Sequence, residues 1–220
     1  MRLSGYSLYM LCTLVLVFTG QAMAGEWIDE FDDEEQMAEV WTPLFGNWVF
    51  MDGIYRMEMG PGCGAAITDF EVSDGTTIEI KAQYVDGGWE NYSIIFAYMS
   101  DEEAYQVDIR GGGEIVKVER FTPGTETVQS LAQGNQVADR NVWYTLTVVI
   151  DGDTVIGFVD EKEIVRYTFP QGLPEGKIGL GGQQSNTEFE YMTITGPRIG
   201  LAVSHIGKLA ATWAGIKAQD

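Results

Sequence analysis

Histidine and cysteine, the residues that most often hold transition metals or serve as catalytic bases and nucleophiles, are nearly absent from this sequence. Its 220 residues include one histidine, His205, and two cysteines, Cys12 and Cys63. A zinc site or a histidine-based catalytic triad needs histidine beside further ligands or beside a nucleophile. The composition therefore argues strongly against both kinds of site.

Positive charge is also scarce. The chain has 13 Lys and Arg against 33 Asp and Glu, which gives a formal net charge of −20. Binding to nucleic acid or to anionic lipid depends on basic patches. Nucleic acid is therefore not an expected partner, and no glycine-rich loop precedes an expected helix, so nucleotide binding has no support either.

Long hydrophobic runs are missing except at the start of the chain. An apolar run from Leu8 to Phe18 follows the basic Arg2 and precedes Ala22-Met23-Ala24. This order is typical of a secretory signal peptide that is cut after Ala24, and the run is too short for a comfortable membrane span. We expect residues 1–24 to be a signal peptide and the mature protein to be extracytoplasmic, without a membrane span. A retained N-terminal anchor is the alternative.

Removal of the signal peptide would also remove Cys12 and leave Cys63 without a disulfide partner. The mature domain must then be stabilised by its core alone. No base lies near Cys63 in the sequence, so we expect a small buried side chain and not a reactive thiol.

Turn residues and β-forming segments are abundant in the rest of the chain. Turn signals recur at short intervals, among them Gly46-Asn47, Asp52-Gly53, Asp86-Gly87-Gly88, Gly111-Gly112-Gly113, Asp151-Gly152-Asp153 and Gly181-Gly182. The intervening segments are rich in β-branched and aromatic residues, and Trp143–Ile150 with Val155–Val159 reads as a hairpin. Residues 25–196 are therefore predicted to form an all-β sandwich or jelly roll of two antiparallel sheets, almost free of helix.

The last residues follow another pattern. In residues 197–220 the apolar side chains of Ile206, Leu209, Trp213 and Ile216 fall on one helical stripe. We expect a short C-terminal helix that docks on the sandwich, with a partner-binding or surface-attachment segment as the alternative.

A recurring order of turn and aromatic segments runs from about Glu26 to Thr195. The segments are Phe31-Asp32-Asp33, Trp41, Gly46–Arg56, Tyr92–Tyr98, Ala104-Tyr105, Trp143-Tyr144, Gly176–Leu180 and Glu188–Ile194. Together they resemble the concanavalin A-like jelly rolls of the laminin-G-like and 3-keto-disaccharide-hydrolase-like group. The matching residues are mostly turn glycines and aromatic residues, so they specify the fold better than the function.

The resemblance implies a sandwich whose concave face or rim loops meet sugars, with some relatives hydrolysing glycosides and many only binding. A carbohydrate-binding module is the leading interpretation. A glycoside hydrolase acting on modified disaccharides, and a structural or protein-binding domain, are the alternatives. The Glu-x-Asp-x-x-Glu pattern of family 16 glycoside hydrolases is absent, and the nearest carboxylates are Glu79 and Asp108.

The segment Glu103–Arg110 alternates between apolar and polar residues, which places Gln106, Asp108 and Arg110 on the face that meets solvent or a ligand. A carboxylate and a guanidinium two residues apart point the same way and can hold sugar hydroxyls, or they can form a simple surface ion pair. Trp89, in a polar glycine-rich loop, and Tyr98 offer flat side chains for stacking on sugar rings. These five residues are the predicted carbohydrate site.

Acidic residues gather in Asp29–Glu35. Jelly rolls often bind calcium where the first and last strands meet, so Asp32 or Asp33 with Glu190 is a candidate calcium site. A solvated acidic edge is the alternative.

Overall fold

The computed structural model describes residues 24–58, 60–88, 91–113 and 115–199. The expected signal peptide up to residue 23, Trp89 and the expected C-terminal helix lie outside the described residues. Within the described residues, no helix is long and apolar enough to cross a membrane.

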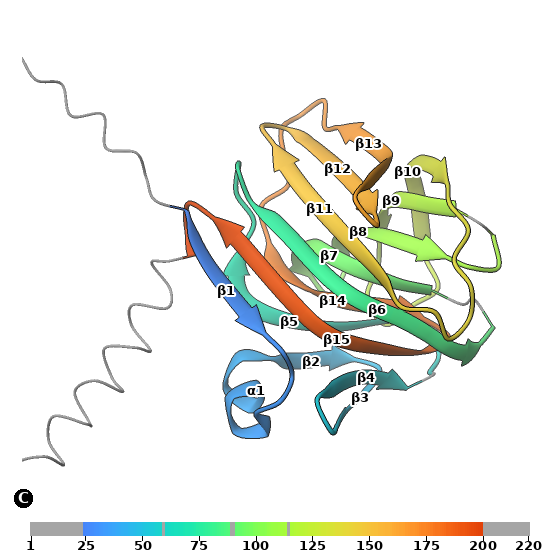
Figure 1. Cartoon of the computed structure of the whole chain (residues 1–220). Coiled ribbons are helices and arrows are strands. Elements are labelled where there is room, and N and C mark those ends of the chain that lie inside the picture. The colour runs from blue at the N-terminus through green and yellow to red at the C-terminus, as the bar shows by residue number, and fades with distance from the viewer. Residues whose placement is uncertain (1–23, 59, 89–90, 114, 200–220) are drawn as a thin grey trace, which may run out of the picture.

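The described chain folds into two antiparallel sheets that pack face to face (Figure 1). The larger sheet has the order β13-β12-β11-β6-β15-β4-β3, with β1 also paired to β15. Its strands are β1 (Gly25–Asp29), β3 (Asn47–Met51), β4 (Ile54–Glu58), β6 (Thr77–Gly87), β11 (Tyr144–Asp151), β12 (Thr154–Val159), β13 (Lys162–Thr168) and β15 (Ser185–Gly196).

The second sheet has the order β10-β9-β8-β7-β14-β5-β2. Its strands are β2 (Thr42–Phe45), β5 (Cys63–Glu71), β7 (Asn91–Ser100), β8 (Glu103–Arg110), β9 (Ile115–Phe121), β10 (Val128–Asn135) and β14 (Lys177–Gln183). Several sequence neighbours pair within a sheet, among them β7 with β8 and β11 with β12, and other connections cross between the two sheets, as in a jelly roll. The predicted all-β sandwich is confirmed.

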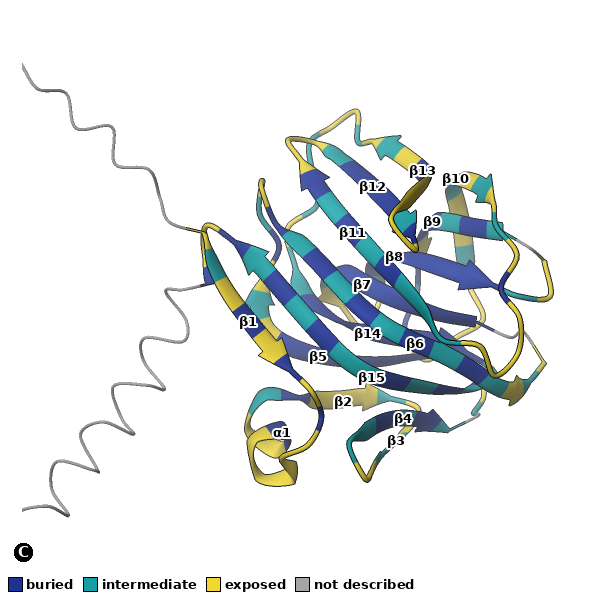
Figure 2. Cartoon of the chain, in the orientation of Figure 1, coloured by how far each residue is buried: buried dark blue, intermediate teal, exposed yellow. Residues whose placement is uncertain are grey.

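The core lies between the two sheets and follows from the two-residue period of the strands. In β6 the buried Ile78, Ile80 and Ala82 alternate with half-buried residues, and Figure 2 shows this banding along the larger sheet. The opposing sheet contributes Val107 and Ile109 from β8 to the same core cluster.

The predicted hairpin is confirmed as β11–β12, in which Asp151 pairs with Thr154 across a two-residue turn. Gly152 begins the turn at φ +57°, a left-handed conformation that glycine adopts without steric cost.

A short helix, α1 (Glu34–Val40), was not predicted. Asp33 caps its N-terminus by accepting a hydrogen bond from the Gln36 backbone N–H at 3.1 Å, and Met37 packs inward. The helix is hard to recognise in the sequence, because an N-cap residue followed by acidic residues in the first turn has the same composition as an acidic loop.

The segment before α1 is fixed by Asp29, a buried carboxylate at the end of β1. It accepts hydrogen bonds from the Phe31 backbone N–H at 2.9 Å and from Trp41 Nε1 at 2.8 Å. Burial raises the pKa of Asp29 above its ordinary value, and the two hydrogen bonds oppose that rise. Asp29 thus links Phe31, which precedes α1, to Trp41, which follows it. Both of these side chains pack against Tyr55.

Candidate functional site

The face of the seven-stranded sheet that points away from the main core carries an unusual group of polar side chains. On β8 the residues Gln106, Asp108 and Arg110 share this face, because Val107 and Ile109 between them enter the core. Neighbouring strands add further members. We call the following set the polar cluster: Asn91, Ser93, Gln106, Asp108, Arg110, Lys117 and Glu119.

Four charges lie together in the polar cluster. Arg110 Nε donates to Asp108 Oδ2 at 2.5 Å, and Arg110 Nη2 donates to both oxygens of Glu119 at 3.1 and 3.2 Å. Lys117 Nζ lies 3.6 Å from Glu119 Oε1. Two cations therefore balance two carboxylates that are themselves closed to solvent.

Neutral side chains complete the hydrogen bonding of these charges. Asn91 Nδ2 donates to Asp108 Oδ1 at 2.9 Å, and Gln106 Nε2 donates to Glu119 Oε2 at 3.2 Å. Ser93 Oγ in turn donates to Gln106 Oε1 at 2.8 Å. Buried charges are tolerated when they are paired and hydrogen-bonded in this way.

Asn91 also ties the polar cluster to the turn between β14 and β15. Its Oδ1 accepts from the Gln183 backbone N–H at 2.6 Å, and its own backbone N–H donates to Ser185 Oγ at 3.0 Å. These contacts fix the strand ends at which β7, β14 and β15 meet.

Burial raises the pKa of Asp108 from 3.8 to about 7, with the nearby Glu119 carboxylate adding to the rise and Arg110 opposing it. Desolvation disfavours the charged form of an acid, and a second carboxylate does the same. Asp108 therefore keeps its proton at a higher pH than an ordinary aspartate does.

The solvent-facing atoms of the polar cluster belong to its two cations. The side chains of Arg110 and Lys117 are 8% and 16% exposed, whereas those of Asp108 and Glu119 are 0% exposed. A ligand that approaches this face would meet N–H donors first. The carboxylates set the position of those donors.

The sequence-predicted residues are only partly brought together. Gln106, Asp108 and Arg110 interact as one group, but their ion pair is buried and is not the surface pair considered as an alternative. Tyr98 lies at the other end of β7, beside Ala104, and its hydroxyl donates to Asp101. Trp89 lies outside the described residues.

The sequence patterns did not point to four members of the polar cluster, Asn91, Ser93, Lys117 and Glu119. Lys117 and Glu119 alternate with Val116 and Val118 in β9, so the same two-residue period could have found them. The strand register that sets Lys117 opposite Asp108 and Glu119 opposite Gln106 is not visible in a single sequence.

The candidate calcium ligands take separate roles. Asp33 caps α1, Asp32 is exposed, and Glu190 Oε2 pairs with Lys81 Nζ at 2.5 Å. Among the described residues no three acidic, histidine or cysteine side chains form a group suited to a metal ion. A calcium site at these residues stays a prediction.

Cys63 is buried, as expected, and burial raises its thiol pKa to about 12.

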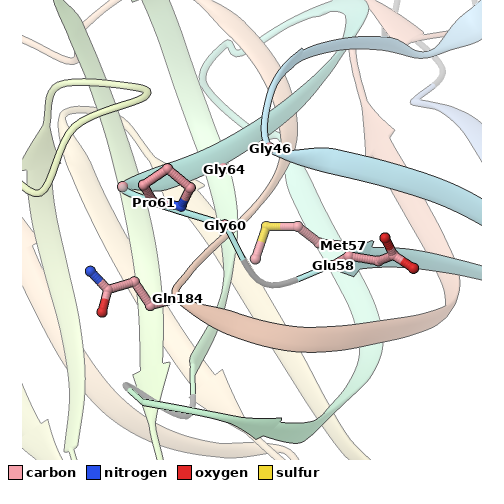
Figure 3. A pocket seen from close by; sticks show the side chains of 8 residues that line it. Gly46, Met57, Glu58, Gly60, Pro61, Gly64 and Gln184 are labelled. Carbon is pink, nitrogen blue, oxygen red and sulfur yellow. The ribbon is translucent and has the colours of Figure 1, made fainter.

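Hollows lie at two places on the described part of the chain. The one in Figure 3 lies between β4, β5 and Gln184, and the side chain of Met57 crosses it. This hollow has almost no volume that a water-sized molecule could occupy, so it leaves no room for a sugar ring. The other is a cavity of about 250 Å³ lined by Glu102, Arg120, Phe121, Thr122, Thr127 and Gln129.

Known structures share the fold. A carbohydrate-binding module, CBM66, from Bacillus subtilis superposes with a TM-score of 0.61 at 18% identity, over 68% of this chain and 91% of that one. A Bacillus licheniformis β-glucanase gives 0.57 at 13% identity, over 77% and 97%. A Bacillus subtilis protein with a galectin-like fold gives 0.61 at 10% identity, over 78% and 97%. The predicted concanavalin A-like jelly roll is thereby confirmed.

Sequence comparison places the chain more narrowly. Curated proteins give no match. A family model described as the 3-keto-alpha-glucoside-1,2-lyase-like domain matches residues 26–195, the segment that also carries the resemblance seen in the sequence. Since this match takes in most of the 220 residues, the chain belongs to the 3-keto-α-glucoside-1,2-lyase-like domain family.

Proposed function

We propose that this protein is an exported carbohydrate-binding β-sandwich and that the polar cluster orients the ligand. The observation that carries the proposal is the pair of cations, Arg110 and Lys117, held at the solvent side of a sheet face by two buried carboxylates. Sugar hydroxyls accept hydrogen bonds from such fixed donors. Preorganised donors cost little entropy on binding.

The charge of the whole chain favours a neutral ligand. Its formal net charge is −20, so an anionic sugar would meet a repulsive field. Two structural neighbours, a carbohydrate-binding module and a β-glucanase, support a glycan as ligand.

A glycan array with the purified protein, with and without calcium, tests the proposal. Neutral glycans should bind, and a binding pattern unchanged by calcium removal would count against the Asp32, Asp33 and Glu190 site. Lys117→Gln should weaken binding about tenfold, which is about 1.4 kcal/mol. Lys162→Gln, at an exposed position on β13, is the matched control.

The variants also locate the site. If Lys117→Gln and Arg110→Gln both bind as the unmodified protein does while Gln129→Ala loses binding, the ligand lies in the 250 Å³ cavity and not on the polar cluster. Trp89→Ala should weaken binding by about 1–3 kcal/mol if the indole stacks on a sugar ring.

Catalysis is the second candidate, favoured by the family and by the raised pKa of Asp108. A 1,2-lyase acting on a 3-keto glucoside needs a base to take the C2 proton, which the C3 ketone acidifies. The C1–O bond then breaks, and the leaving oxygen takes up a proton. Both oxygens of Asp108 are occupied by Asn91 and Arg110 in this structure, which favours the binding role.

Incubation with a 3-keto-α-glucoside, followed by NMR, separates the two functions. Turnover that disappears in Asp108→Asn would establish the enzyme. Binding of the 3-keto-α-glucoside without turnover would support the proposed carbohydrate-binding function.

Export is tested separately. Protein recovered from outside the cytoplasm should begin at Gly25, and an intact Met1 would contradict the expected cleavage after Ala24.

A further inference from the structure

The connection between β9 and β10, residues 122–127, runs across the face that carries the polar cluster; we call it the strap. It leaves β9 at Phe121, yet its backbone bonds to β5, which is four places away in the order β9-β8-β7-β14-β5. Cys63 N donates to Thr125 O at 2.7 Å, and Gly124 N donates to Cys63 O at 2.9 Å. The strap therefore spans β8, β7 and β14.

Packing beneath the strap shows which face it covers. Phe121, Ala104, Ile95, Ala65 and Cys63 form a second apolar cluster, separate from the core between the sheets. On β8, Ala104 is in phase with Gln106 and Asp108, and on β9 Phe121 is in phase with Glu119. The strap and the polar cluster therefore share one face of the sheet.

The strap packs closely against its neighbours at two glycines, Gly62 and Gly124. A Cβ on Gly62 would lie 2.5 Å from Gly124 O, and a Cβ on Gly124 would lie 2.5 Å from Phe45 Cδ1. Glu126 Oε1 accepts from Gln184 Nε2 at 2.5 Å, and Thr125 N donates to Thr122 O within the strap itself. These contacts hold the strap in one position on the sheet.

The strap crosses the face obliquely. It leaves β9 beside Ala104, and its tip, Gly124 and Thr125, bonds to Cys63 before the chain returns to β10. Cys63 pairs with Gln183, the residue bonded to Asn91. The polar cluster lies between this diagonal and the strand ends at Arg110 and Asn91. A long glycan lying across the strands from β9 towards β5 would collide with the strap.

We propose that the strap restricts the polar cluster to short glycans and glycan ends and excludes internal segments of polysaccharides. This inference rests on the proposed carbohydrate binding. The ligand enters from the strand ends at Arg110 and Asn91, and the strap forms the wall against which it stops.

A length series tests the proposal with the full chain. The probes are α-1,4-linked glucose oligomers from maltose to maltohexaose and amylose, chosen because the family description names an α-glucoside, or the corresponding series of the best array ligand. Affinity per glycan end should level off by the trisaccharide. A steady rise up to the polymer would overturn the proposal.

A second experiment uses variants that displace the strap. Gly124→Ala should displace the strap from Phe45 and raise the affinity for the hexasaccharide relative to the disaccharide by about fivefold. Gly53→Ala is the matched control, since Gly53 has a similar positive φ, +80° against +72°, but no atom within 4 Å of an added Cβ. Glu126→Ala, which removes only the contact with Gln184, should act in the same direction if Gly124→Ala fails to fold.

The outcomes separate the two claims. If no glycan of any length binds, the proposed function falls and the strap inference falls with it. If glycans bind but Gly124→Ala and Glu126→Ala leave the length preference unchanged, only the inference falls.

Discussion

Single residues decide whether the polar cluster is stable, because one guanidinium serves two buried carboxylates. Removing a partner from such a group leaves charge in a low-dielectric surrounding, which costs more than the pair contributes when intact. The contribution of each charge is therefore best tested against an exposed counterpart in the same chain.

Arg110→Ala should lower the free energy of unfolding by about 3–5 kcal/mol, since Asp108 and Glu119 would then lie buried without Arg110. Arg166→Ala should cost much less, because its pair with Glu163 is exposed and screened by solvent. Urea unfolding followed by tryptophan fluorescence measures both. Equal losses in the two variants would contradict the role assigned to Arg110.

Asp108 should make stability depend on pH in a direction opposite to that of an ordinary surface acid. Its folded pKa is raised from 3.8 to about 7, so between these values the folded state binds a proton that the unfolded state has released. The contribution is complete below about pH 4 and is lost as the pH rises towards 7.

Asp108→Asn removes this dependence. As the pH rises from about 4 to about 7, the unmodified protein should lose stability relative to the variant, because only the unmodified protein releases a proton from this buried position. Unfolding curves across that range measure the difference, with the exposed Asp32→Asn as control. Parallel pH profiles for the unmodified protein and Asp108→Asn would show that Asp108 titrates normally.

At the scale of the elements, the alternation of apolar and polar residues and the turn signals were sufficient to predict that the segments between turns form strands. They predicted the β11–β12 hairpin and the polar face of β8, because both depend only on local sequence. They did not reveal that β9 and the start of β7 complete the polar cluster, since pairing partners are long-range. Nor did they predict that Gln106, Asp108 and Arg110 are buried, which depends on how the whole face is packed.

Helix α1 illustrates the same limit. Its seven residues have one buried side chain, Met37, and thus no apolar period to detect. Its position is fixed by the distant contact between Asp29 and Trp41.

Asp29→Ala should therefore destabilise the protein by about 2–3 kcal/mol, because the buried N–H groups of Trp41 and Phe31 lose their acceptor. Glu30→Ala, at an exposed neighbour, should change stability by less than about 0.5 kcal/mol. Thermal unfolding measures both. If Asp29→Ala left the stability unchanged, the hydrogen bonds of Asp29 would not be what holds α1 in place.

At the scale of the whole molecule, net charge is the dominant electrostatic feature. With a formal charge of −20, like charges repel one another across the folded surface. Raising the salt from about 0.01 M to about 0.15 M shortens the screening length from about 30 Å to about 8 Å. The Tm should rise over this range. A Tm that falls with salt would mean that attractive ion pairs outweigh the repulsion.

The pairing of β1 with β15 has a mechanical consequence. Gly25 faces Gly196, so both ends of the sandwich leave from the same end of one antiparallel ladder. A force applied between them would open that ladder one pair at a time, like a zipper, and would not shear all its hydrogen bonds together. Under tension β1 should detach first and at low force, while Arg110 and Asn91, which lie in the other sheet, keep their contacts.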